Sequence, residues 1–152
     1  MLGEMAGKIE KTRRNLEEIG YSAEDVSANE FHYYMTGEIF SDDKTTLEDV
    51  LGNEFLMVHE VPEISELKKM KRPIDKRVIV GSLRHVIYEA HFTAMELELK
   101  CAMFKKDYSW VRFRLERHKC VLEDDPNMPE SLRPRGEAIY SKFHELVRRQ
   151  QT

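Results

Sequence analysis

The sequence predicts an all-α fold, an antiparallel helical bundle of about five or six helices with one long helix that is central or lies at an interface. Apolar residues recur at three- and four-residue spacings along most of the chain, and no stretch alternates with period two and β-branched side chains. The 152 residues, 41% of them hydrophobic and 34% charged, suit one globular domain with its own core. We therefore expect residues 1–152 to form a single helical-bundle domain.

Two helices are predicted in the N-terminal part of the chain. The first covers residues 2–19, where apolar side chains share one face, and Gly20 is a typical residue to end it. Ser22 offers an N-cap for the second helix, because acidic residues follow it in the first turn. We expect that helix to run to Phe40.

A third helix is expected from Thr45 to Val61. Gly52 and Asn53 can split it. Pro62 has no backbone N–H, so it should kink the helix or force a restart. The apolar residues after Pro62 are shifted in phase from those before it, which also favours a break.

Three further helices are predicted in the C-terminal half. The longest covers residues 74–106 and follows Pro73, a residue typical of helix starts. The next begins near Asp107 or Ser109 and ends before Asp124, and after a proline-containing loop the last covers 135–150. Short links between amphipathic helices favour neighbours that run antiparallel.

The predicted helix 74–106 has two apolar faces, and a helix that is apolar on two sides is buried on two sides. It either crosses the centre of its own domain or meets a second copy of the chain, since two-fold dimers are the commonest association. We favour the homodimer, so the function expected is that of a non-catalytic, self-associating protein with an assembly or regulatory role. The stripe assigned to the interface consists of Tyr88, Phe92, Met95, Leu99 and Met103.

The sequence carries no recognisable targeting segment and no motif of nucleophilic catalysis or phosphate binding. Its apolar runs are too short to span a bilayer, and Glu4 interrupts the N-terminus where a signal peptide would need apolar residues. Cys101 and Cys120 form no C-x-x-C pair, and neither a nucleophile elbow nor a phosphate-binding loop is present. We expect a cytoplasmic protein that does not contact membranes, and the sequence favours a protein without catalytic activity.

Charge is distributed unevenly along the chain. Residues 1–63 contain 15 acidic and 5 basic side chains, whereas residues 64–152 contain 13 acidic and 19 basic ones. The two halves either attract each other within one domain or give the C-terminal half a basic surface for an anionic partner.

A divalent metal site is one alternative function. Glu30, Glu54 and His118 fall among apolar residues on the inward faces of their predicted helices, and His91 lies at the edge of such a face. A buried carboxylate needs a partner, and carboxylates with imidazoles on facing helices can bind iron, manganese or zinc inside a bundle.

The spacing expected of di-iron bundle proteins is missing, because the sequence contains no Glu-x-x-His. His59 and Glu63 are one helical turn apart, as are His85 and Glu89. Pro62 argues against the first pair, and the second pair faces away from the predicted core.

RNA binding is the other alternative. Aromatic residues interleave with cations between Lys105 and Lys119, a combination typical of surfaces that bind phosphates and stack single-stranded bases. The cations assigned to this face are Lys105, Lys106, Arg112, Arg114, Arg117 and Lys119.

The spacing of Arg112 and His118 resembles the Arg…His motif of HEPN-type helical ribonucleases. That resemblance covers seven residues and implies ribonuclease activity at this pair. The family usually has a polar residue after the arginine, whereas Phe113 follows here.

Overall fold

The structure is a computed structural model that describes residues 2–150, and it confirms the all-α prediction. No strand occurs among these residues, and none of their helices is both long and apolar enough to cross a membrane. The elements, in chain order, are α1 (Leu2–Glu18), α2 (Ala28–Thr36), α3 (Leu47–Leu51), α4 (Glu54–Lys69), α5 (Val78–Gly81), α6 (Arg84–Phe104), α7 (Tyr108–Asp124), the 3-10 helix η1 (Glu130–Leu132) and α8 (Arg133–Arg148).

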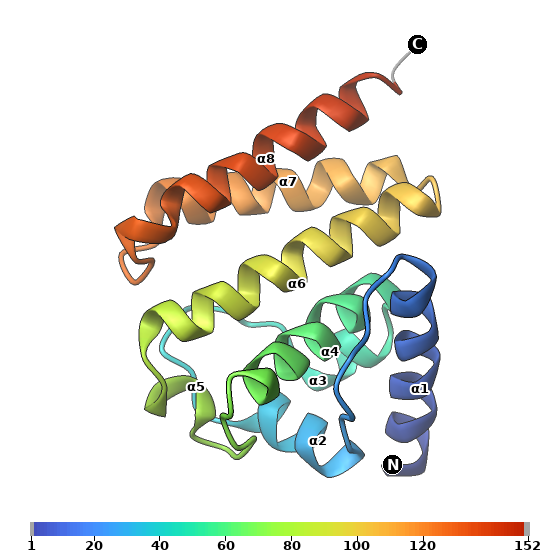
Figure 1. The fold of residues 1–152 in the computed structure, drawn as a ribbon, viewed down its shortest axis with the longest axis vertical. Helices are drawn as coiled ribbons and strands as arrows, with labels where there is room; N and C mark the ends of the chain where they lie inside the picture. The colour runs from blue at the N-terminus through green and yellow to red at the C-terminus, as the bar shows by residue number, and fades with distance from the viewer. Residues whose placement is uncertain (1, 151–152) are drawn as a thin grey trace.

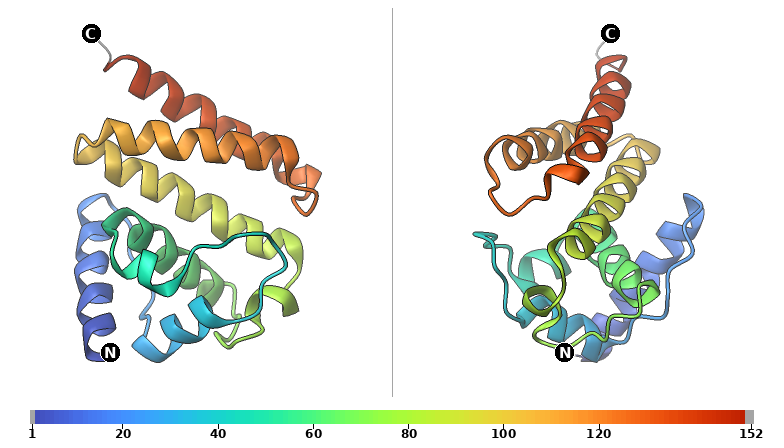
Figure 2. Two further views of the ribbon diagram at one scale, coloured as in Figure 1. Left: turned by 180° about the vertical axis from the view of Figure 1, so that it is seen from behind. Right: turned by 60° about the vertical axis from the view of Figure 1, so that its left-hand side comes forward.

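Helix α6 lies in the middle of the molecule (Figure 1). α7 and α8 pack on one side of it, and α4 packs along the other side with α1, α2 and α3 around it. The views in Figure 2 show the same order from two other directions. Helix α6 is therefore covered by other helices on two sides.

Helix α2 begins later than the sequence pattern predicts. Ser27, rather than Ser22, is the N-cap: its hydroxyl accepts from the Glu30 backbone N–H, and the Glu30 carboxylate accepts from the Ser27 N–H. This capping box satisfies two backbone donors at once, which favours a helix start here. The predicted extension to Phe40 is also absent, because α2 ends at Thr36.

The predicted break at Gly52 and Asn53 is present, and Asn53 caps α4 by accepting from two backbone N–H groups. Pro62, in contrast, does not end the helix, because α4 continues through it to Lys69. The proline costs one backbone hydrogen bond and sits in a wholly buried turn. The prediction of a restart at Pro62 is therefore wrong.

The long helix predicted over 74–106 is divided in two. Ser82 and Leu83 adopt extended backbone conformations and separate the short α5 from α6. α7 and α8 agree with the predicted helices to within a few residues, with Asp107 as the side-chain cap of α7 and Pro134 in the first turn of α8.

The second apolar stripe of α6 is covered within one chain. Phe92 and Leu99 are fully buried, and Tyr88 and Met95 are 6% and 3% exposed. Met103, near the end of the helix, is half-buried. These side chains do not form a free face, so the alternative of a central helix describes the structure, and this stripe is not available as a dimer interface.

Candidate metal centre

Two polar residues of α4 point into the core one helical turn apart. His59 and Glu63 are both buried, and His59 Nε2 lies 2.9 Å from Glu63 Oε2. Side chains at positions i and i+4 share one helical face, so α4 presents both to α6. The buried Pro62 lies beside Glu63 and does not disturb this spacing.

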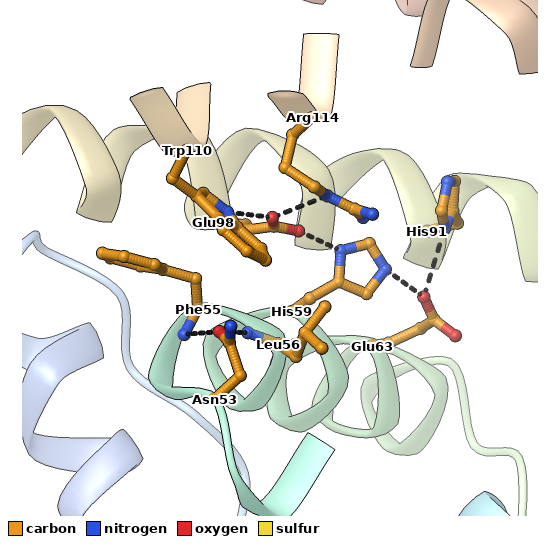
Figure 3. Close-up of polar contacts among 9 residues, drawn as sticks. All are labelled: Asn53, Phe55, Leu56, His59, Glu63, His91, Glu98, Trp110 and Arg114. Carbon is orange, nitrogen blue, oxygen red and sulfur yellow. Dashed lines mark hydrogen bonds and ion pairs between the residues drawn. The ribbon is translucent and has the colours of Figure 1, made fainter. Parts of the chain in front are cut away.

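Helix α6 meets this pair with two residues that lie two turns apart. His91 Nδ1 lies 3.3 Å from Glu63 Oε2, and Glu98 Oε1 lies 2.9 Å from His59 Nδ1. Figure 3 shows the His59 ring held between the two carboxylates, with His91 beyond Glu63. Glu98 is fully buried, whereas the His91 side chain is 27% exposed.

Helix α7 and helix α2 hold the outer ends of the two carboxylates. Trp110 Nε1 donates to Glu98 Oε2 over 2.6 Å, and Arg114 Nε lies 2.7 Å from the same oxygen as an ion pair (Figure 3). The Tyr34 hydroxyl donates to Glu63 Oε1. Each carboxylate thus uses one oxygen on the His59 side and is oriented through the other.

Burial and neighbouring charges shift the pKa values of His59, Glu63 and Glu98 in opposite directions. Burial disfavours the imidazolium, but hydrogen bonds to Glu63 and Glu98 outweigh it and raise the pKa of His59 to about 10. Burial likewise opposes ionisation of Glu63 and Glu98, yet their contacts with His59 hold the pKa of each carboxyl below its usual range. His59 is therefore an imidazolium that donates from both ring nitrogens.

The pKa of the neighbouring Glu60 is raised, unlike the pKa values of Glu63 and Glu98. Glu60 is half-buried on the same turn of α4, and burial together with the charge of Glu63 raises the pKa of its carboxyl to about 8. At neutral pH Glu60 is therefore mostly a neutral carboxylic acid, and the ionised carboxylates of Glu63 and Glu98 are balanced by the His59 imidazolium and the Arg114 guanidinium.

The ligand atoms of His59, Glu63 and His91 all lie within 4.8 Å of one another. Atoms that share a tetrahedral zinc ion at about 2.0–2.1 Å are separated by roughly 3.3 Å, so modest side-chain adjustments bring these three to one ion. Two imidazoles and one carboxylate form a ligand set typical of zinc or ferrous iron sites that keep an open position. Of the three residues, His91 is the one that is partly exposed to solvent.

Of the four metal ligands predicted from the sequence, only His91 lies in this cluster. Glu30 belongs to the α2 capping box and pairs with Lys68 over 2.9 Å, and Glu54 pairs with Lys105 over 3.1 Å near the surface. His118 is buried against α8, where its Nε2 donates to the Gly136 carbonyl over 2.8 Å. Burial lowers the pKa of His118, so its ring is neutral and serves to join α7 to α8.

The cations predicted to bind RNA do not share one environment. Lys106, Arg112, Arg117 and Lys119 are exposed, and Lys105, also at the surface, pairs with Glu54. Arg114 is held inside by Glu98. Arg112 and His118 also differ, one exposed and the other 1% exposed, so they do not face a common surface.

The one-turn spacing of His59 and Glu63 is visible in the sequence, but Pro62 between them argues against a shared helical face. Because α4 continues through Pro62, both residues lie on one face and the spacing is a valid signal of the site. Glu98, seven residues after His91, was a second such signal. Tyr34, Trp110 and their roles could not be found without knowing which helices meet.

The raised pKa of His59 predicts that the metal-free protein loses stability in alkali. Its folded pKa exceeds the ordinary value, so the stabilisation is complete below about pH 6.5 and disappears as the pH rises through about 10. For Glu63 and Glu98 the sign reverses, and their contribution is lost as the pH falls below the ordinary carboxyl range. Urea unfolding at several pH values should show a smaller alkaline loss for His59→Gln than for the wild type. Equal losses would show that another group is responsible.

Comparison with known proteins adds no family to this geometry. No protein-family model, no curated protein and no solved structure matches the chain.

Proposed function

We propose that this protein binds one divalent transition-metal ion, zinc or ferrous iron, through His59, Glu63 and His91. The observation that carries the proposal is the convergence of three ligand atoms within 4.8 Å from two helices. Three protein ligands leave a coordination position free, as in metal sites that bind water or a substrate.

The surroundings of these residues support the proposal. Metal-binding histidines usually donate their second ring N–H to a carboxylate, which fixes the ring orientation. Glu98 has this relation to His59, since it accepts from Nδ1 and leaves Nε2 directed at Glu63. The Tyr34 hydroxyl donates to Glu63 Oε1 and so fixes the orientation of that carboxylate.

In the absence of metal, the proton on His59 Nε2 lies between that nitrogen and Glu63 Oε2, where the metal ion would bind. A metal ion must displace that proton, because an imidazole binds metal only through an unprotonated nitrogen. Binding is therefore expected to release a proton and to strengthen as the pH rises.

The direct test is calorimetric titration of chelator-treated protein with Zn²⁺. We expect one ion per chain for the wild type. His91→Ala should weaken binding by more than the roughly 10- to 100-fold typical of lost outer-sphere partners, because it removes a ligand. His91 is partly exposed, so its removal leaves the core intact.

The matched control is His85→Ala, which removes an exposed histidine from the same helix. It should bind Zn²⁺ like the wild type. No binding by the wild type, or equal weakening by both variants, would show that His59, Glu63 and His91 form a proton-bridged network and not a metal centre.

Self-association, a cytoplasmic location and RNA binding stay predictions from the sequence. A dimer would need a surface other than the buried stripe of α6. RNA would have to bind through the exposed cations of α7, without Arg114 and Trp110, which are engaged with Glu98.

A further inference from the structure

A groove of about 540 Å³ runs along α7 beside the metal centre. One wall consists of α7 side chains, and the opposite wall is α3 with the start of α4. Phe113 is 51% exposed there, and its ring lies 5.5 Å from that of Trp110. The α7 residues that line the groove are Trp110, Phe113, Arg114 and Arg117.

Two of these residues belong to both the groove and the metal centre. Trp110 and Arg114 line the groove, and both contact Glu98, which in turn contacts His59. Figure 3 shows the Arg114 side chain reaching Glu98, with its terminal nitrogens on the side of His91. The groove is thus linked to His59 through Glu98.

The terminal nitrogens of Arg114 are available to a ligand. Nε faces Glu98, but neither Nη atom makes a hydrogen bond to another residue between 2 and 150. A guanidinium presents its donors as a planar fork that matches a carboxylate or a phosphate. A half-buried guanidinium that lines the groove, and whose terminal nitrogens have no partner among residues 2–150, points to an anionic ligand.

We propose that this groove binds a small organic anion, a carboxylate or phosphate carried on an aromatic body. The oxyanion bonds to Arg114, with Arg117 as a second cation, and the ring lies against Trp110 and Phe113. Binding in the groove does not depend on the metal. The further step, in which an oxygen of the anion reaches the open coordination position, rests on the proposed function.

The opposite wall limits the size and charge of the ligand. Glu48 and Asp49 line it, and Asp49 is fixed by the Thr46 backbone N–H in the cap of α3. These carboxylates repel a long polyanion, whereas a single oxyanion at Arg114 avoids them. This arrangement favours a small molecule over RNA.

Trp110 makes the proposal measurable, because it is the only tryptophan of the chain and lines the groove. Its fluorescence is followed while phenyl phosphate, benzoate or phenol is added, with and without Zn²⁺. We expect saturable quenching by at least one of the two anions and none by neutral phenol. The anion with the higher affinity shows whether the groove prefers a phosphate or a carboxylate. Tighter binding of that anion in the presence of Zn²⁺ shows that its oxygen reaches the metal.

Two pairs of variants test which residues bind the anion. Arg114→Gln should weaken binding about tenfold or more, as expected for lost charge-assisted hydrogen bonds, whereas Arg112→Gln on the exposed face of the same helix should have no effect. Phe113→Ala should also weaken binding, and the ring that it removes is 51% exposed. Its control, Phe104→Ala, removes an exposed ring outside the groove.

The outcomes separate the two proposals. Saturable quenching that depends on Arg114 in a protein that binds no Zn²⁺ would leave the anion groove standing and remove the metal centre. Stoichiometric Zn²⁺ binding without quenching by either anion would overturn the groove alone. Quenching by phenol equal to that by the anions, or quenching unchanged in Arg114→Gln and Phe113→Ala, would also overturn it.

Discussion

Replacement of Glu98 by alanine should lower the free energy of unfolding by about 3–5 kcal/mol, the range for removing one partner of a buried ion pair. Glu98 is fully buried and holds three groups at once, so its loss leaves the His59 Nδ1–H, the Arg114 guanidinium and the Trp110 N–H without their acceptor. Urea unfolding followed by circular dichroism measures the change. The same variant should bind Zn²⁺ about 10- to 100-fold more weakly, because His59 is no longer oriented.

Glu96→Ala is the matched control, on the same helix and of the same residue type. Glu96 pairs with Lys142 over 3.3 Å at the surface, and a surface pair contributes less than about 1 kcal/mol. If the two variants unfolded at similar urea concentrations, Glu98 would not be the centre of the network described above.

Replacement of Phe92 by alanine should cost about 3–5 kcal/mol of unfolding free energy through the cavity that it leaves. Phe92 is fully buried, its ring lies 5.8 Å from His118 in an edge-on arrangement, and its Cζ atom is close to the backbone of Gly136. A Cβ atom at Gly136 would lie 3.2 Å from that Cζ, so α8 approaches the ring closely and cannot easily collapse into the space.

Phe104→Ala provides the comparison, because Phe104 is 60% exposed on the same helix and its removal should change stability by no more than about 0.5 kcal/mol. Light scattering on both variants completes the test. A Phe92→Ala protein that stayed as stable as the wild type but dissociated from dimer to monomer would restore the interface interpretation of the second stripe of α6.

Helix positions were largely predictable, because the spacing of apolar residues reflects which side of a helix is buried. The residues at which helices begin and end depend on local capping contacts, and the spacing of apolar residues does not show which of several possible caps is used. Ser22 and Ser27 are both suitable N-caps, and only the reciprocal contact with Glu30 selects Ser27. The break before α6 at Ser82 and Leu83 carried no glycine or proline signal at those two positions.

The burial of both faces of α6 could be predicted, but not what covers the second face. A stripe of apolar residues has the same appearance whether α7 and α8 or another chain packs on it. The choice depends on the turn between α6 and α7, where Lys106 adopts positive φ and the chain folds back. A lysine is not a residue from which such a turn is expected.

The candidate metal centre was only partly predictable for a related reason. One-turn spacing brings His59 and Glu63 together within α4, and this is a local property of a helix. Which polar residues meet them depends on the register between α4 and α6, and a shift by one turn would have paired other side chains. The apolar context of Glu30 and Glu54 suggested burial, although an ion pair with a nearby lysine holds each of them closer to the surface.

Zinc K-edge X-ray absorption of the zinc-loaded protein tests most directly whether His59, Glu63 and His91 hold a divalent metal ion. The predicted spectrum has nitrogen and oxygen neighbours at about 2.0–2.1 Å with the outer-shell scattering of two imidazoles, and His91→Ala reduces that scattering to one imidazole. A sulfur neighbour at about 2.3 Å would assign the ion to Cys101 or Cys120, and a spectrum unchanged by His91→Ala would place it elsewhere. Either result would contradict the proposed centre.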